Sequence, residues 1–406
     1  MRQGLTRLAL AALLGLAPAA APRAQQVSDE AVRIGVLNDQ SGLYADIGGA
    51  GSVAAARLAA AEFGNRVLGR PVEILHADNQ NRADIAAATA RRWIDGERVD
   101  ALADGSASSS ALAMQEVSRE KRRIFLASGP ATSDLTGRFC SPFGFHFTYD
   151  TYALASGTGR ALTQQGGDTW FFITADYAFG HALERDTAGF VREAGGRVLG
   201  AVRHPLNTAD FSSYLQQARA SRAKVVGLAD AGTDFDNALK QAAEFGLVRG
   251  GQRMAGLLVF ITNIHALGLA VTQGLVATTS FYWDRDERTR EWHRRFAAAH
   301  GGRAATMVQA GTYSAVRHYL RAVEAAGTDD SEAAAAMMRR MPVQDMNNQN
   351  VEIRADGRVL HDMLLVQAKA PEESIGPWDY YRILARIPGA EAYRPPGQSE
   401  CPLLRR

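Results

Sequence analysis

The sequence predicts an α/β protein of two doubly wound parallel-sheet lobes joined by a three-crossing hinge. Segments with strand-like and helix-like patterns alternate along the chain with short connections, which favours parallel sheets covered by helices. This alternation starts afresh after Asp150, so two similar lobes are expected. The length of 406 residues is also more than one ordinary hydrophobic core needs.

The first lobe is expected to begin with four strands and three helices. Runs rich in β-branched residues predict the strands, and alanine-rich runs with helical spacing predict the helices. The strands are predicted at 32–38, 71–77, 99–103 and 123–128, with helices at 52–63, 84–94 and 110–122 between them.

The second lobe repeats this rhythm, and further elements follow it. Strands are predicted at 169–174, 197–202, 224–229, 257–261 and 274–283, with helices at 151–165, 181–194, 211–220 and 234–245. Two later helices, at 287–300 and 306–326, do not extend the second sheet, and a late strand pair follows them at 363–367 and 380–384.

A chain that returns to lobe one and crosses back again explains this order. We therefore assign 31–147 plus 284–360 to lobe one, 148–283 plus 361–386 to lobe two, and 387–406 to a C-terminal tail. Three crossings make a hinge, and a hinge allows the cleft between the lobes to close on a ligand.

Residues 1–24 have the layout of a secretory signal peptide. Arg2 and Arg7 precede an apolar run that is too short to span a bilayer, and small residues crowd toward Ala24. Loss of these residues would change the formal charge from +2 to −1. We therefore expect a periplasmic protein without a nucleic-acid partner, because phosphate binding needs clustered basic residues.

The two cysteines, Cys140 and Cys401, lie in the exported part of the chain, where disulfides persist. Their spacing does not match a metal site. A disulfide that pins the proline-rich tail to the body is favoured over two free thiols.

The sequence lacks recognisable motifs for catalysis or cofactor binding. Gly48-Gly49-Ala50-Gly51 comes after the first strand, but the third glycine of a dinucleotide fingerprint is missing, and no P-loop occurs. The histidines do not pair in a metal-binding pattern. We expect no enzyme activity, no cofactor and no metal. An exported α/β hydrolase is the least favoured alternative, because its nucleophile elbow is absent.

Two turns rich in hydroxyl groups are candidate anion sites. Ser108 and Ser109 begin a predicted helix, where hydroxyls and free backbone N–H groups meet. The turn Ser128-Gly129-Pro130-Ala131-Thr132 follows the next strand. Ligands of open α/β sheets bind beyond the carboxyl ends of the strands, so both turns are expected to face one cleft.

Aromatic residues recur at turns that should border this cleft, which favours a pocket with apolar walls and few polar anchors. The candidates are Tyr44, Tyr149, Tyr152, Tyr177, Phe179 and Tyr282.

The order and spacing of these segments resemble the periplasmic solute-binding proteins of ABC importers, of the branched-chain amino-acid-binding (type I) family. The resemblance rests on Ser41-Gly42-Leu43-Tyr44-Ala45, Asp78-Asn79-Gln80, Ser108-Ser109-Ser110, Ser128-Gly129-Pro130-Ala131-Thr132 and Tyr177-Ala178-Phe179-Gly180. It implies that Ser108, Pro130 and Thr132 hold a ligand carboxylate and that Phe179 lies over the ligand from lobe two. It also implies an inner-membrane ABC permease as partner, and we expect a monomer.

The resemblance is incomplete where amino-acid binders of this family carry a lobe-two glutamate for the ligand ammonium. Here the corresponding stretch, 260–265, contains Asn263 and no acid, and Asp230 is the candidate substitute. A buried ammonium without a carboxylate partner is costly. The segment 140–150 also resembles the branch associated with aromatic acids. We therefore favour a benzoate- or cinnamate-like ligand. Alternatives are a branched-chain or other amino acid, an amide, or a sensor role.

Overall fold

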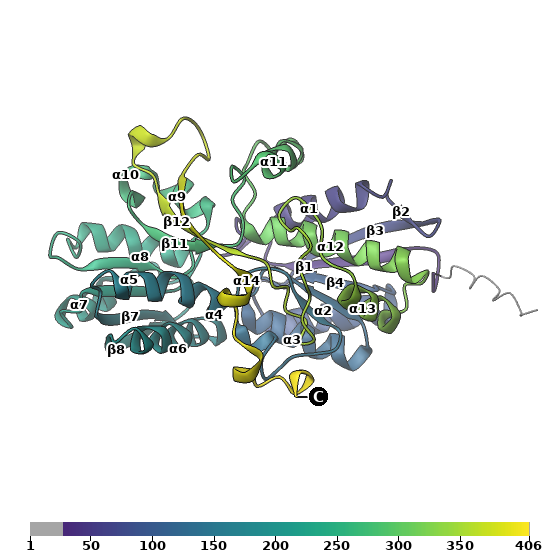
Figure 1. The fold of residues 1–406 in the computed structure, drawn as a ribbon, viewed down its shortest axis with the longest axis horizontal. Coiled ribbons are helices and arrows are strands. Elements are labelled where there is room, and N and C mark those ends of the chain that lie inside the picture. Colours follow the sequence, from purple (N-terminus) through teal and green to yellow (C-terminus); the bar gives the residue numbers. More distant parts are fainter. Residues whose placement is uncertain (1–26, 406) are drawn as a thin grey trace, which may run out of the picture.

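The computed structural model describes residues 27–405, so the signal peptide predicted at 1–24 lies outside the described residues. The chain forms two lobes, each built on a mainly parallel sheet, and a smaller antiparallel sheet runs alongside their junction (Figure 1). The predicted fold class, α/β with two doubly wound lobes, is confirmed. None of the helices within residues 27–405 combines the length and the hydropathy that a membrane span requires.

Lobe one has six strands in the order β2-β3-β1-β4-β5-β6, and only β2 runs antiparallel to its neighbour. Strands β4 and β5 are wholly buried, as expected for strands covered by helices on both faces. The elements are β1 (Val32–Asn38), α1 (Gly49–Ala61), β2 (Arg66–Val67), β3 (Arg70–Asp78), α2 (Ala83–Gly96), β4 (Ala101–Asp104), α3 (Ser108–Lys121), β5 (Ile124–Ala127) and β6 (Gly144–His146).

Lobe two has four parallel strands in the order β10-β9-β7-β8. Its entry helix, predicted at 151–165, is interrupted by a π turn at Ala155–Gly159. The elements are α4 (Thr151–Leu154), α5 (Arg160–Gln164), β7 (Thr169–Ala175), α6 (Ala178–Glu193), β8 (Arg197–His204), α7 (Ser212–Ala220), β9 (Val225–Ala229), α8 (Thr233–Glu244) and β10 (Arg253–Gly256).

The apolar run at 257–261 is not a strand, so that prediction is wrong. The ladder between β10 and β9 ends at Gly256, and helix α9 (Ile261–Leu267) begins after Phe260. The Asn263 side chain accepts a hydrogen bond from the Phe260 N–H at 2.9 Å and caps this helix. The run is buried although it lies outside the sheet, and an apolar pattern alone does not distinguish these two situations.

The strand predicted at 274–283 is also shorter than expected and belongs to a different sheet. Only β11 (Val276–Thr279) forms, after the short helix α10 (Leu269–Thr272). It pairs antiparallel with β12 (Met363–Ala368), which pairs with β13 (Tyr381–Ile387). The late strand pair therefore builds a three-stranded sheet with β11 instead of extending the parallel sheet of lobe two.

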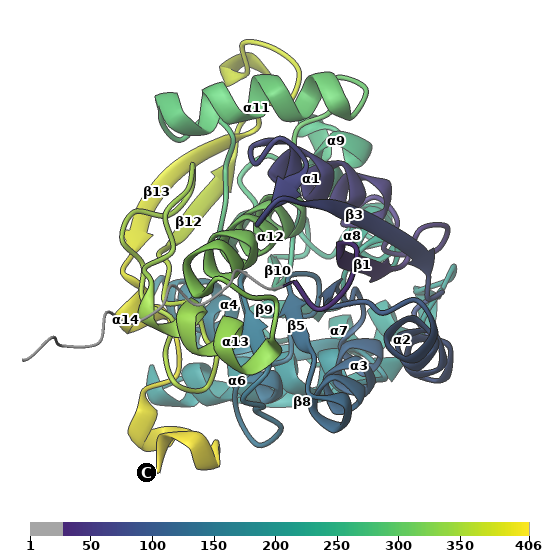
Figure 2. The ribbon, with the colours of Figure 1, turned by 90° about the vertical axis from the view of Figure 1, so that its right-hand side faces the viewer.

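Three helices from late in the chain pack with lobe one, namely α11 (Glu287–Ala299), α12 (Met307–Ala326) and α13 (Ser331–Arg340), the last of which was not predicted. Helix α12 lies against α1 and beside α13 (Figure 2). Every residue of α12 from Met307 to Val316 is buried. This helix brings a distant part of the chain to the lobe junction.

A buried arginine joins two of the crossings between the lobes. The guanidinium of Arg358 donates to the carbonyl oxygens of His146 and Thr148 and lies 3.5 Å from the carboxylate of Asp150. The Asp150 side chain in turn caps α4 by accepting from the Ala153 N–H at 2.8 Å. The first crossing is therefore fixed to the third.

The C-terminal tail contacts both lobes. After β13 it passes through α14 (Gly389–Ala392), and Arg394 then binds the Asp186 carboxylate of lobe two at 3.0 Å. The tail ends on lobe one, where Cys401 forms a disulfide with Cys140, the two Cα atoms being 5.7 Å apart. The predicted bridge is confirmed.

Candidate functional site

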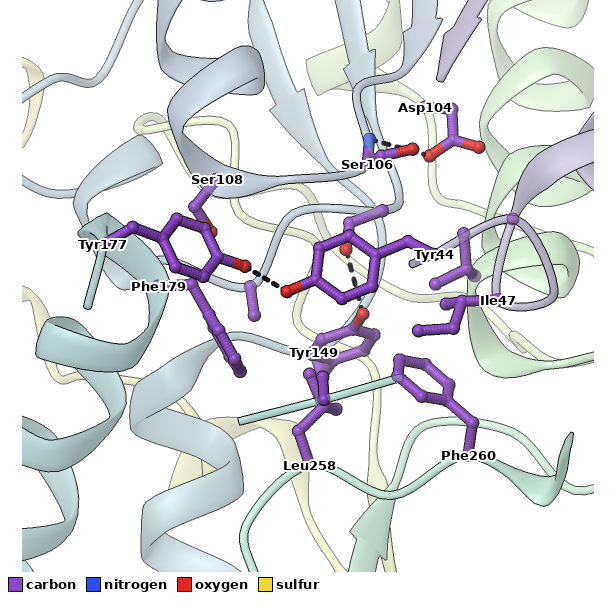
Figure 3. A pocket seen from close by; sticks show the side chains of 15 residues that line it. Tyr44, Ile47, Asp104, Ser106, Ser108, Tyr149, Tyr177, Phe179, Leu258 and Phe260 are labelled. Carbon is purple, nitrogen blue, oxygen red and sulfur yellow. Dashed lines mark hydrogen bonds between the residues drawn. The ribbon is translucent and has the colours of Figure 1, made fainter. Parts of the chain in front are cut away.

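A cavity lies where the two lobes meet, beyond the carboxyl ends of their parallel strands (Figure 3). This is the expected place for a ligand of open α/β sheets. The cavity is small, about 20 Å³, which is enough for one water molecule. The lining residues are Tyr44, Ile47, Gly48, Asp104, Ser106, Ser108, Gly129, Ala131, Tyr149, Tyr177, Phe179, Ala231, Leu258, Phe260 and Val308.

Two tyrosines close the cavity from opposite lobes. Tyr44 follows β1 and Tyr177 precedes α6, and their hydroxyl oxygens form a hydrogen bond of 2.6 Å. Burial raises the pKa of both phenols, so both are protonated at neutral pH. A Cβ atom at Gly232 of lobe two would lie 2.5 Å from the carbonyl oxygen of Leu43. The lobes are thus in direct contact here.

Aromatic rings form the apolar walls. Phe179 and Phe260 come from lobe two, and Tyr149 comes from the first crossing. The Tyr149 ring packs edge-on against Phe260 at 5.9 Å, and its hydroxyl donates to the Gly129 carbonyl at 2.9 Å. Its polar end is thereby satisfied, and the cavity presents ring faces and edges to a ligand.

Lobe one supplies most of the polar wall. Ser108 is the first residue of α3, whose first-turn N–H groups have no partner inside the helix. The Ser108 Oγ accepts from the Thr132 N–H at 3.2 Å, which leaves its hydroxyl proton for another acceptor. Ser106 accepts from the Asp39 N–H at 2.7 Å in the same way. Hydroxyls at a helix N-terminus are suited to an anion.

Among the described residues that line the cavity, Asp104 alone carries a carboxyl group, and none carries a basic side chain. Asp104 ends β4 and has a left-handed backbone, with φ of 74°. Burial raises the pKa of this carboxyl, while hydrogen bonds from Ser52 and Asn38 act in the opposite direction. The lobe-one wall therefore combines hydroxyl donors with one acid.

Six of the residues predicted from the sequence line the cavity, and their role in binding stays a prediction. They are Tyr44, Ser108, Ala131, Tyr149, Tyr177 and Phe179.

Four more predicted residues do not line the cavity. The Ser128 hydroxyl forms a hydrogen bond of 2.7 Å with the Thr312 hydroxyl of α12. The Pro130 carbonyl oxygen lies 2.9 Å from a ring nitrogen of His146. Thr132 caps a short helix by accepting from the Asp134 N–H at 3.3 Å. Ser109 lies in the first turn of α3 but does not line the cavity.

Tyr152, Asn263 and Tyr282 do not line the cavity either. The Tyr152 ring packs on Phe190, 4.9 Å between centroids, near the tail. Asn263 caps α9 and also donates to Asp236 at 2.9 Å. The Tyr282 hydroxyl donates to Asp379 beside the antiparallel sheet at 3.2 Å. Their polar groups serve local structure in this arrangement.

Asp230, the candidate ammonium partner of lobe two, is fully buried beside the cavity and does not line it. One of its carboxylate oxygens lies 3.6 Å from His204 Nε2. Burial raises the pKa of Asp230, and the nearby His204 opposes that shift. The neighbouring residue, Ala231, lines the cavity instead.

Sequence reasoning missed several lining residues. The Asp104-Gly105-Ser106 turn at the end of β4 carried a signal, because polar residues follow a buried strand there. The sequence carried no such signal for Ile47, Leu258 and Val308, because an apolar residue beside a ligand has the same sequence pattern as one in the hydrophobic core.

Comparisons with known proteins agree on one family. The family model described as a periplasmic binding protein matches residues 31–373. A periplasmic binding protein from Burkholderia mallei is 48% identical, with a TM-score of 0.90 over 92% of this chain and 99% of that chain. A branched chain amino acid ABC transporter periplasmic ligand-binding protein from Burkholderia xenovorans is 38% identical, with a TM-score of 0.82 over 92% of this chain and 100% of that one.

Two further known proteins are less similar in sequence. A solute binding protein from R. palustris in complex with benzoate is 18% identical, with a TM-score of 0.80 over 92% of this chain and 99% of that chain, and shares the fold. Leu/Ile/Val-binding protein homolog 6 from Brucella abortus is 26% identical over 259 residues, which are 63% of this chain. The match spans 65% of the length of that Brucella protein. The chain belongs to the periplasmic binding protein family, and its two parallel-sheet lobes have the type I architecture.

Proposed function

We propose that the protein is a periplasmic receptor that captures a small carboxylate between its lobes and delivers it to an inner-membrane ABC permease. An aromatic acid, such as a benzoate or cinnamate derivative, is the favoured ligand. The receptor acts as a monomer and carries out no covalent chemistry. The ligand-bound, closed form is the state that the permease recognises.

The observation that carries the proposal is the composition of the interlobe cavity. Phe179, Phe260 and Tyr149 offer aromatic surfaces, and Ser108 offers a hydroxyl at the N-terminus of α3. An aromatic carboxylate matches this division, because its ring needs apolar walls and its charge needs donors. A ligand of that size exceeds the cavity of about 20 Å³. Binding therefore requires the Tyr44–Tyr177 pair to separate and the lobes to close again around the ligand.

Calorimetric titration with benzoate, cinnamate and leucine tests the proposal. We expect at least one acid to bind, and we expect Ser108→Ala to weaken that binding roughly 10- to 100-fold, because hydrogen bonds to charged groups contribute about 1.5–3 kcal/mol. Ser109→Ala is the matched control, since Ser109 is the next residue of the same helix and does not line the cavity. Unchanged acid binding by Ser108→Ala would remove the carboxylate assignment.

A further inference from the structure

Asp104 lies on the lobe-one wall beside the groups that are suited to an anion. It lines the same cavity as Ser106 and Ser108, and it is fully buried. Figure 3 shows Asp104 and Ser106 next to each other on this side of the cavity. A carboxylate is an acceptor and not a donor, so this part of the wall differs in kind from the hydroxyls beside it.

Two cavity-lining glycines make room for this carboxyl group. A Cβ atom at Gly129 would lie 2.3 Å from Asp104 Oδ1, and one at Gly48 would lie 2.8 Å from Asp104 Oδ2. Either side chain would occupy the space next to the carboxyl oxygens. Because neither position has a side chain, only backbone atoms of these glycines lie next to the carboxyl oxygens, and the carboxyl group can line the cavity.

The hydrogen bonds of Asp104 leave part of its accepting capacity unused. Asn38 Nδ2 donates to Oδ2 at 2.8 Å, and the Ser106 N–H donates to Oδ1 at 3.3 Å. The Ser52 hydroxyl is a third donor. Two carboxylate oxygens accept about four hydrogen bonds, so one site remains.

No positive charge of the described residues faces this carboxyl group. The charged neighbour that affects its ionisation is Asp39, which disfavours the ionised form. Burial and, after it, the charge of Asp104 raise the pKa of the Tyr149 phenol. A plain ligand carboxylate would add a second negative charge in a buried site, and two like charges there repel strongly. A ligand group that donates a hydrogen bond would instead complete the acceptor set.

From this geometry we infer that Asp104 determines specificity, by requiring the bound solute to present an N–H or O–H donor to lobe one next to its acidic group. The inference rests on the proposed function and narrows its ligand class to acids that also carry an ammonium, amide or hydroxyl group. It also reopens α-amino acids as ligands. The doubt about them rested on a missing lobe-two acid, and lobe one supplies one.

Matched ligand pairs test this inference on the wild-type protein. Phenylalanine and 3-phenylpropanoate, leucine and 4-methylpentanoate, and 2-hydroxybenzoate and benzoate each differ by a single donor group. We expect the member with the donor to bind at least tenfold more tightly in one or more pairs, measured by calorimetric titration. Equal or tighter binding of the members without a donor, in every pair that binds, would overturn the inference while leaving carboxylate capture intact.

The Asp104→Asn variant then identifies the residue responsible. It keeps the size of the side chain and removes its charge, so the preference for the donor should fall at least tenfold. Asp100→Asn is the matched control, because Asp100 is a buried lobe-one acid at the opposite end of β4 and does not line the cavity. A purely structural role would weaken both members of a pair alike. An unchanged preference in Asp104→Asn overturns the inference.

Amides separate this inference from the proposed function. Phenylalaninamide retains the ammonium and lacks the carboxylate. If it binds as tightly as phenylalanine, carboxylate capture fails and the role of Asp104 stands. If no acid or amide of the panel binds, both fail.

Discussion

Removal of the disulfide between Cys140 and Cys401 should lower thermal stability by an amount that follows from its position in the chain. The bridge joins residues 261 apart. Loop-closure entropy then predicts a stabilisation of about 5.6 kcal/mol at 25 °C. The described part of the chain has about 380 residues, and its unfolding entropy is about 0.8 kcal/mol/K at roughly 2.1 cal/mol/K per residue. The expected fall in Tm is therefore about 7 °C.

Scanning calorimetry of the Cys140→Ala/Cys401→Ala variant measures this fall. Wild type pretreated with dithiothreitol is the control, because the reduced protein keeps both sulfur atoms in place and loses only the cross-link. Both samples should unfold about 7 °C below the oxidised wild type. A fall of less than 1 °C in the reduced wild type would refute the reasoning, since the unfolded chain would then gain no measurable freedom from the loss of the bond.

Three further predictions concern single residues. Burial raises the pKa of Asp100 to about 7, so the folded protein holds an extra proton between about pH 4 and 7, and its unfolding free energy falls as pH rises through that window. In urea unfolding, the free energy of Asp100→Asn should fall less than that of the wild type over this range. Parallel pH profiles of the two proteins would contradict the prediction. Gly129→Ala should lower the free energy of unfolding by about 1–3 kcal/mol, because its Cβ would lie 2.7 Å from a backbone nitrogen. The Cβ of Gly189→Ala in α6 would meet nothing within 4 Å. This variant should raise the free energy of unfolding by about 0.5–1 kcal/mol in the same denaturation assay. Tyr177→Phe keeps its ring and loses the hydroxyl bond to Tyr44, worth about 1 kcal/mol. Because this bond must break before a solute enters, acid affinity measured by titration should rise about fivefold. A fall in affinity would mean that this hydroxyl binds the solute directly.

The pattern of the sequence was sufficient for elements whose burial follows a regular period. Strand β1 has the predicted bounds, and α11 and α12 begin within one residue of the prediction. The strand prediction at 257–261 failed because the apolar side chains of this run are buried at the lobe junction by parts of the chain that are distant in sequence. Pairing of β11 with β12 depends equally on contacts across more than eighty residues, which no local pattern contains.

The candidate site was predictable in outline and not in its chemistry. Turns at the carboxyl ends of strands indicated Ser108 and Tyr177, because topology alone brings such turns together. Topology does not say which polar side chain of a turn is used locally. Thr132 and Asn263 cap helices, whereas Asp104, at the end of a buried strand, faces the cavity. Asp104 also has a left-handed backbone with a positive φ, which the residue types at this turn do not indicate.

The carboxylate of Asp186 on α6 connects three parts of the molecule. It accepts from Ser133 of lobe one at 2.8 Å, from Thr151 of the first crossing at 2.6 Å, and from Arg394 of the tail at 3.0 Å. An opening of the cleft that separates α6 from Ser133 would break part of this set. The apparent dissociation constant of a receptor equals the intrinsic value divided by the fraction of molecules in the binding-competent form. A change at Asp186 that alters this fraction would therefore change the apparent affinity for every solute by the same factor, independently of the residues that determine specificity.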